Sequence, residues 1–160
     1  MSFHAYFGTK HSAVTSADTI GLDPRQLAEL PRLPSATADR LMTELAAGRD
    51  PVVRAQVVEE LTDVLEHASP LASISWLTHC ALSRSANVRR LVGEVLAADV
   101  MRVGAATIVE HLSVDPTPSV RAQAAVTARA LLARNPVAYR SVLRRLSADP
   151  DPLVVAAVTR

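Results

Sequence analysis

The chain has 160 residues, of which 49% are hydrophobic and 3% aromatic, and its formal net charge at pH 7 is +1. This length suits one domain with a sizeable core, and the small net charge argues against a general polyanion-binding protein. A membrane span is not expected, because no apolar run approaches about 18 residues. A secretory signal is not expected, because the first residues lack its pattern. A disulfide framework is not expected, because Cys80 is the single cysteine. We therefore expect a soluble, cytoplasmic protein without membrane contact.

Residues 1–21 differ from the rest of the chain and are interpreted as a flexible N-terminal arm. The arm holds three of the five aromatic residues in the sequence, namely Phe3, Tyr6 and Phe7. We expect these aromatics either to stay in solvent or to dock onto an apolar surface of this chain or of another protein. A short capping helix is predicted next, beginning at Asp23 and Pro24 and closed by Pro31.

From residue 36 onward one short signature returns at nearly constant spacing. A Val-Arg pair stands at 53–54, 88–89 and 120–121, and Val-Val replaces it at 154–155, so the spacings are 35, 32 and 34 residues. Each copy follows an Ala- and Leu-rich segment, which predicts a unit made of a first helix, a turn and a second helix. Within a repeat domain of residues 22–160, we expect helix pairs at approximately 36–68, 70–99, 102–134 and 136–160.

The local patterns support helices throughout this domain. In the first Val-Arg copy, Val53, Val57 and Leu61 recur at helical spacing, with polar residues between them. The Asp-Pro turns at 115–118 and 149–152 are predicted to start second helices, since they combine a capping residue with proline at the first helical turn. No comparable segment alternates with a period of two, so strands are not expected. Short helix pairs of this kind must stack on one another to bury their apolar faces.

The Asp-Pro-x-Pro-x-Val-Arg pattern, seen best at residues 115–121, resembles HEAT repeats, in particular the compact bacterial kind related to the phycobilisome-lyase type. The resemblance covers residues 36–160. It implies a right-handed α-solenoid of about four HEAT-like helical hairpins, preceded here by the arm and the capping helix. It also implies a ladder in which turn aspartates and second-helix arginines tie adjacent repeats together. The residues that match this ladder are Arg54, Arg89, Asp115 and Arg121, whereas Ser83 and Val155 stand where an Asp and an Arg would be expected.

Charge is distributed unevenly along the chain, with ten acids and six bases in residues 1–66 but six acids and eleven bases in residues 67–160. Two charged sets remain outside the ladder. The first set is interpreted as a partner-binding surface or a merely solvated helix face. It consists of Glu59, Glu60, Asp63 and Glu66, and in HEAT-like superhelices its helix lines the concave side. The second is a candidate patch for an anionic partner, although it lacks interleaved aromatics. It consists of Arg129, Arg134, Arg140, Arg144 and Arg145.

No residue constellation points to catalysis, a metal or a cofactor. His79 and Cys80 are adjacent and so point about 100° apart on a helix, and the sequence has no glycine-rich phosphate loop and no H-E-x-x-H motif. We therefore expect a non-catalytic scaffold or adaptor that binds another protein on its concave face. The alternatives are a nucleic-acid-binding or DNA-glycosylase-like HEAT protein and an accessory subunit that handles a small ligand or cofactor. Self-association is a further expectation, because no repeat follows the apolar segment at 153–158.

Overall fold

The computed structural model of the protein describes residues 29, 35–48, 50–98 and 104–159, and within these ranges it contains eight helices and no strand. Within these ranges the prediction of an all-helical fold is confirmed. The helices are α3 (Ser35–Ala47), α4 (Pro51–His67), α5 (Pro70–Ala81), α6 (Ala86–Ala97), α7 (Ala105–Leu112), α8 (Pro118–Ala130), α9 (Pro136–Leu146) and α10 (Pro152–Thr159). None of these helices is long and apolar enough to cross a membrane. The predicted arm, with Phe3, Tyr6 and Phe7, and all of the predicted capping helix except Glu29 lie outside the described residues.

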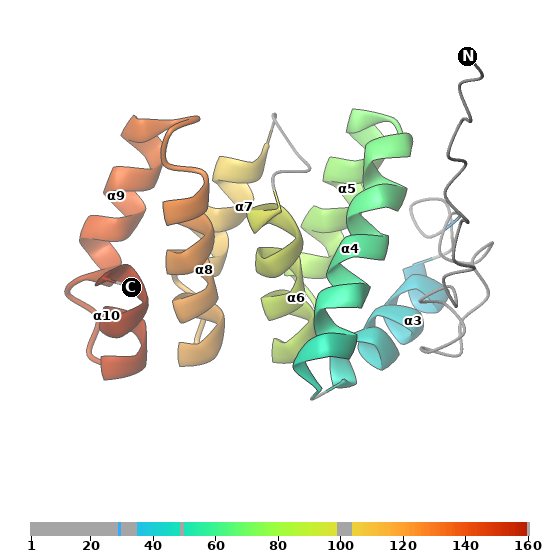
Figure 1. The fold of residues 1–160 in the computed structure, drawn as a ribbon, viewed down its shortest axis with the longest axis horizontal. Helices are drawn as coiled ribbons and strands as arrows, with labels where there is room; N and C mark the ends of the chain where they lie inside the picture. The colour runs from blue at the N-terminus through green and yellow to red at the C-terminus, as the bar shows by residue number, and fades with distance from the viewer. Residues whose placement is uncertain (1–28, 30–34, 49, 99–103, 160) are drawn as a thin grey trace, which may run out of the picture.

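The helices from α4 onward form two rows (Figure 1). In one row α4, α6, α8 and α10 pack side by side, and in the other α5, α7 and α9 do so. Consecutive helices such as α5 and α6, or α7 and α8, pack across the rows. From α4 onward, each helix thus contacts the helix two places further along the chain.

The first described helix departs from this regularity. α3 packs mainly against α6, and it runs obliquely to α4 in Figure 1. Its apolar residues Leu41, Met42 and Leu45 are buried. On its other side, Asp39 Oδ1 lies 2.9 Å from Nε2 of His79 on α5. α3 therefore touches both rows at one end of the described body.

Side-chain caps and first-turn prolines explain where several helices begin. Asp50 Oδ1 accepts hydrogen bonds from the backbone amides of Val52 and Val53, at 2.8 and 3.3 Å, directly before Pro51. These amides have no partner inside the helix, and proline at this position loses no hydrogen bond. Ser69 and Asn135 cap α5 and α9 in the same way.

The turn before α8 differs from the sequence expectation. The N-cap position belongs to Thr117, whose side chain makes no capping hydrogen bond. Asp115 instead accepts a hydrogen bond from the backbone amide of Thr117 at 2.8 Å and so orders the turn itself. Its carboxylate is thereby aimed at the neighbouring helix pair.

The core lies between the rows and is formed mainly by leucine, valine and alanine. α6 and α8 lie in close contact at Gly93, where an added Cβ would lie 2.7 Å from Cγ of Gln123. There the Thr127 hydroxyl donates to the Gly93 carbonyl at 2.8 Å. Trp76 is only 6% exposed and belongs to this core. Among the described charged residues, Arg54 and Asp115 are buried.

Candidate functional site

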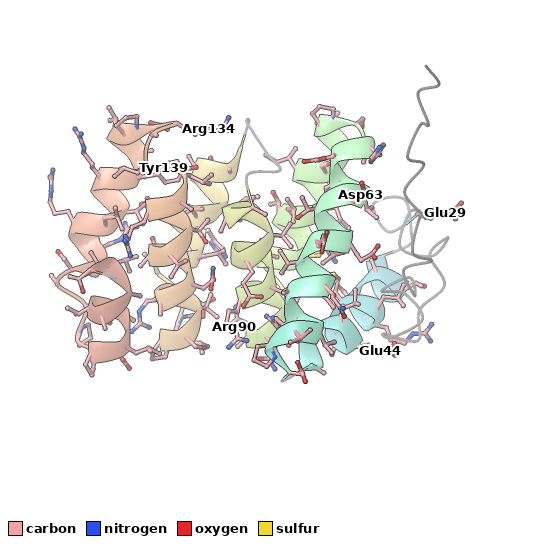
Figure 2. The ribbon with its side chains drawn as sticks, in the orientation of Figure 1. Glu29, Glu44, Asp63, Arg90, Arg134 and Tyr139 are labelled. Carbon is pink, nitrogen blue, oxygen red and sulfur yellow. The ribbon has the colours of Figure 1, made fainter. Side chains whose placement is uncertain are left out.

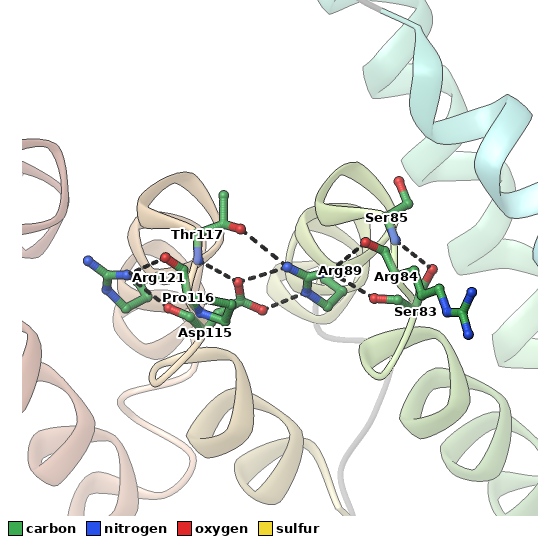
Figure 3. Close-up of polar contacts among 8 residues, drawn as sticks. All are labelled: Ser83, Arg84, Ser85, Arg89, Asp115, Pro116, Thr117 and Arg121. Carbon is green, nitrogen blue, oxygen red and sulfur yellow. Dashed lines mark hydrogen bonds and ion pairs between the residues drawn. The ribbon is translucent and has the colours of Figure 1, made fainter.

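The arginines of the Val-Arg copies join neighbouring helix pairs. Arg89 on α6 donates from Nε to Asp115 Oδ2 at 2.6 Å and from Nη2 to Asp115 Oδ1 at 2.9 Å (Figure 3). Its Nη1 donates to the carbonyl oxygens of Ser83 and Arg84, in the turn before its own helix, at 2.8 and 3.1 Å. One guanidinium therefore holds two successive turns together, and we call each such arginine–carboxylate link a rung.

The next rung repeats these bonds. Arg121 on α8 donates to both carboxylate oxygens of Asp149, at 2.7 and 2.9 Å. It also donates to the carbonyl oxygens of Asp115 and Pro116, in the turn before α8, at 2.8 and 3.2 Å. The side chains of Arg121 and Asp149 are 14% and 8% exposed, so the rung is largely withdrawn from water. This shielding limits its screening by salt.

The rungs lower the pKa values of both aspartates. The hydrogen bond from Arg121 holds the pKa of Asp149 below its ordinary value. Burial raises the pKa of Asp115, but the hydrogen bonds from Arg89 and from the Thr117 amide outweigh it, so its pKa is also lowered. Both carboxylates are therefore charged at neutral pH and stabilise the arginines beside them.

The first rung uses a different carboxylate. Ser83 occupies the turn before α6, and Arg54 donates to both oxygens of Glu94 on α6, at 2.6 and 3.3 Å. Its Nη1 donates to the Ala46 carbonyl at 2.9 Å. Glu94 also lies 3.2 Å from Arg90. Sequence reasoning missed Glu94 because it is 40 residues from Arg54, and only the contact between α4 and α6 brings the two together.

The predicted acidic set lies on one outward side of α4. Glu59, Asp63 and Glu66 are exposed and Glu60 is half-buried, whereas the opposite side of the helix carries buried leucines. We call Glu59, Glu60, Asp63 and Glu66 the acidic face; Asp63 is labelled in Figure 2. Val52 is 67% exposed and stands seven residues before Glu59, on the same side of the helix. An apolar side chain thus extends the acidic face toward the start of α4.

Most of the acidic face lacks a cation within the described part of the chain. Asp63 lies 3.5 Å from Nδ1 of His67, whose ring nitrogen also lies 2.8 Å from the Asp63 backbone carbonyl oxygen. That backbone contact, followed by the Asp63 carboxylate, raises the pKa of His67. Among the described residues, Glu59, Glu60 and Glu66 form no ion pair. The face therefore presents negative charge that His67, beside Asp63, offsets in part.

The five arginines of the predicted basic set do not act as one unit. Arg145 is engaged, since it donates to Glu110 on α7 at 2.7 Å and to the Ser113 hydroxyl. Arg134, labelled with Tyr139 in Figure 2, also interacts within the fold. The remaining three are exposed and form no ion pair with any described residue. They are Arg129 on α8 and Arg140 and Arg144 on α9.

Cys80 is not a reactive thiol, and the described residues form no metal-binding group. Cys80 is fully buried, and burial, with a smaller effect from Asp39, raises the pKa of its thiol to about 12. Its thiolate is therefore not available for attack at neutral pH. The pairing of His79 with Asp39 was not foreseen, because these residues lie 40 positions apart. No group of three or more His, Cys, Asp or Glu within the described ranges is arranged to hold a metal ion.

Comparison of the chain with models of protein families, with curated proteins and with solved structures finds no match.

Proposed function

We propose that this chain is a HEAT-like α-solenoid that acts as a non-catalytic scaffold or adaptor and binds a basic segment of another protein. The observation that carries the proposal is the acidic face of α4. Its Glu59 and Glu66 are exposed and form no ion pair within the described residues. Asp115 and Asp149, by contrast, are used to hold the fold. An exposed charge that the fold does not use is available to a partner.

The repeated bonding of the arginines supports the solenoid part of the proposal. Arg89 and Arg121 stand 32 residues apart in the sequence and make the same set of bonds, two to the next turn's aspartate and two to carbonyls of their own turn. The same structural unit is therefore used twice. Stacking of like units on their nearest neighbours is the principle of helical-repeat proteins.

The spacing of the acidic face favours a basic protein segment. Glu59 and Glu66 are seven residues apart on one helix, which corresponds to about 10 Å along the axis. Lysine or arginine side chains about three residues apart in an extended segment, or about seven apart in a helix, match such a distance. Charge complementarity speeds their association and selects among partners. Val52 supplies an apolar contact at the edge of the face.

The experiment is a quantitative pull-down from source-cell lysate with three baits. They are the unmodified chain, a triple variant with Glu59→Gln, Asp63→Asn and Glu66→Gln, and a matched control with Arg129→Gln, Arg140→Gln and Arg144→Gln. We expect a protein partner to be retained by the unmodified chain and the control, and at least tenfold less by the acidic-face variant. Added salt should weaken its binding. Equal recovery on all three baits would show that the partner does not use this face.

A second candidate function rests on Arg129, Arg140 and Arg144, which are exposed and form no ion pair within the described residues. Arginines of this kind can contact nucleic-acid phosphates. If this function holds, the arginine variant loses DNA or RNA binding while the acidic-face variant keeps it, and the affinity falls steeply with salt. Recovery of protein alone would speak against it.

A further inference from the structure

An apolar groove lies between α5 and α7, apart from the acidic face. We call it the α5–α7 groove; it has a volume of about 320 Å³, and apolar side chains that include Ile74, Ala81 and Ile108 line it. Gly104 also lines it and has a φ of +84°, and an added Cβ there would collide with the side chain of Ile74. The left-handed glycine therefore lets Ile74 settle against the start of α7.

The rim of the groove leaves apolar surface uncovered by the described residues. Leu82 is 65% exposed at the rim. Leu71, three residues before Ile74 on α5, is 78% exposed and extends the apolar strip. Pockets that are mostly apolar with a few polar groups suit aromatic rings, and Thr78 and His111 supply polar groups here. The chemistry of the groove thus favours an aromatic occupant.

We propose that the α5–α7 groove binds the aromatic segment of the chain's own N-terminal region, residues 3–7. Of the five aromatic residues in the sequence, the described body holds two, Trp76 and Tyr139, and both are buried in its core. The other three are Phe3, Tyr6 and Phe7. Aromatic side chains provide large apolar area at low conformational cost, so this segment is the part of the chain best suited to fill the groove.

The connection to α3 allows this docking. α3 lies beside α5 through the contact between Asp39 and His79. A second hollow of about 570 Å³ is lined by these two residues and by Leu82, so it reaches from α3 to the rim of the groove. The 27 residues from 8 to 34 can span roughly 90 Å when extended, far more than the length of one helix. A tether of this kind gives an effective concentration of about a millimolar, so weak intrinsic affinity suffices.

The isoleucines make the test direct. The chain has three, Ile20, Ile74 and Ile108, and the last two line the groove. Methyl NMR spectra of the isoleucine-labelled 160-residue chain are compared with spectra of a variant that carries Phe3→Ala, Tyr6→Ala and Phe7→Ala. A matched control carries His4→Ala, Thr9→Ala and Lys10→Ala. We expect the Ile74 and Ile108 signals to shift in the aromatic variant and to stay in place in the control, with helical circular dichroism unchanged in both.

A spin label then locates the segment. Ala5→Cys adds a thiol for the label, whereas buried Cys80, with its thiol pKa raised to about 12, stays unlabelled. We expect the label to abolish the Ile74 and Ile108 signals, reduction of the label to restore them, and the aromatic triple variant to retain them. Unchanged shifts together with retained signals would overturn the proposal. A second experiment mixes chains that carry only the spin label with chains that carry only the isoleucine label. Loss of the Ile74 and Ile108 signals in this mixture would also overturn the proposal, because a second copy would then fill the groove.

Discussion

The rung between Arg121 and Asp149 provides the most direct test of what holds the helix pairs together. Arg121→Met keeps most of the side-chain stem but removes the guanidinium, whose four hydrogen bonds reach Asp149 and two carbonyls of the turn before α8. Asp149→Asn removes the charge of the partner with little change in shape. A double-mutant cycle built from both substitutions isolates the pair from the carbonyl contacts.

The expected magnitude follows from the burial of the rung. With side chains 14% and 8% exposed, removal of Arg121 leaves a carboxylate largely out of water and without its cation. Breaking a fully buried pair costs about 3–5 kcal/mol, and a hydrogen bond to a charged group contributes about 1.5–3 kcal/mol. The bonds between Arg121 and Asp149 are part-buried, so the lower end of the first range applies. We therefore expect Arg121→Met to lower the free energy of unfolding by about 3 kcal/mol, with a coupling energy to Asp149 of about 2 kcal/mol.

Urea unfolding followed by circular dichroism measures all four chains of the cycle. Arg140→Met is the matched control, since Arg140 is exposed and forms no ion pair with any described residue; its effect should stay within about 0.5 kcal/mol. A coupling energy below about 0.5 kcal/mol between Arg121 and Asp149 would refute the reasoning, because the rung would then contribute no more than a solvated surface pair.

Three further predictions concern the carboxylate of Asp149, the left-handed backbone at Gly104 and the exposed side chain of Leu153. The pKa of Asp149 is lowered in the folded chain. The stability that this carboxylate contributes is therefore present above its unfolded pKa and is lost as the pH falls through its folded pKa. The difference in unfolding free energy between the native chain and the Asp149→Asn variant should consequently shrink in acid. A constant difference down to the lowest pH would contradict it. Gly104→Ala should destabilise by about 2 kcal/mol or more in urea, since φ is +84° and the new Cβ meets Ile74; adding Ile74→Ala should recover part of the loss. Leu153 on α10 is 52% exposed and offers an apolar contact to a second copy of the chain. Light scattering should then show concentration-dependent dimers that the Leu153→Asp substitution abolishes. A monomer at all concentrations would exclude this contact.

The acidic face of α4 shows how far local pattern reaches. The 3.6-residue period places Glu59, Asp63 and Glu66 opposite the apolar stripe, and the structure finds all three exposed. The predicted basic set also placed Arg145 with Arg140, although Arg145 is engaged with Glu110 on another helix. Helical period determines the side of a helix on which a residue lies. It does not determine what the neighbouring helix brings to that side.

The sequence by itself determined the helices and the identity of the rung arginines, because helical period, capping residues and first-turn prolines act over a few residues and the Val-Arg copies recur at nearly constant spacing. Tertiary structure alone decided the carboxylate that each arginine meets. Asp115 and Asp149 lie 26 and 28 residues beyond their arginines, and Glu94 lies 40 beyond Arg54. Such pairs form only after apolar faces have set the separation and tilt of the helices, and that packing has no signature in the short-range pattern.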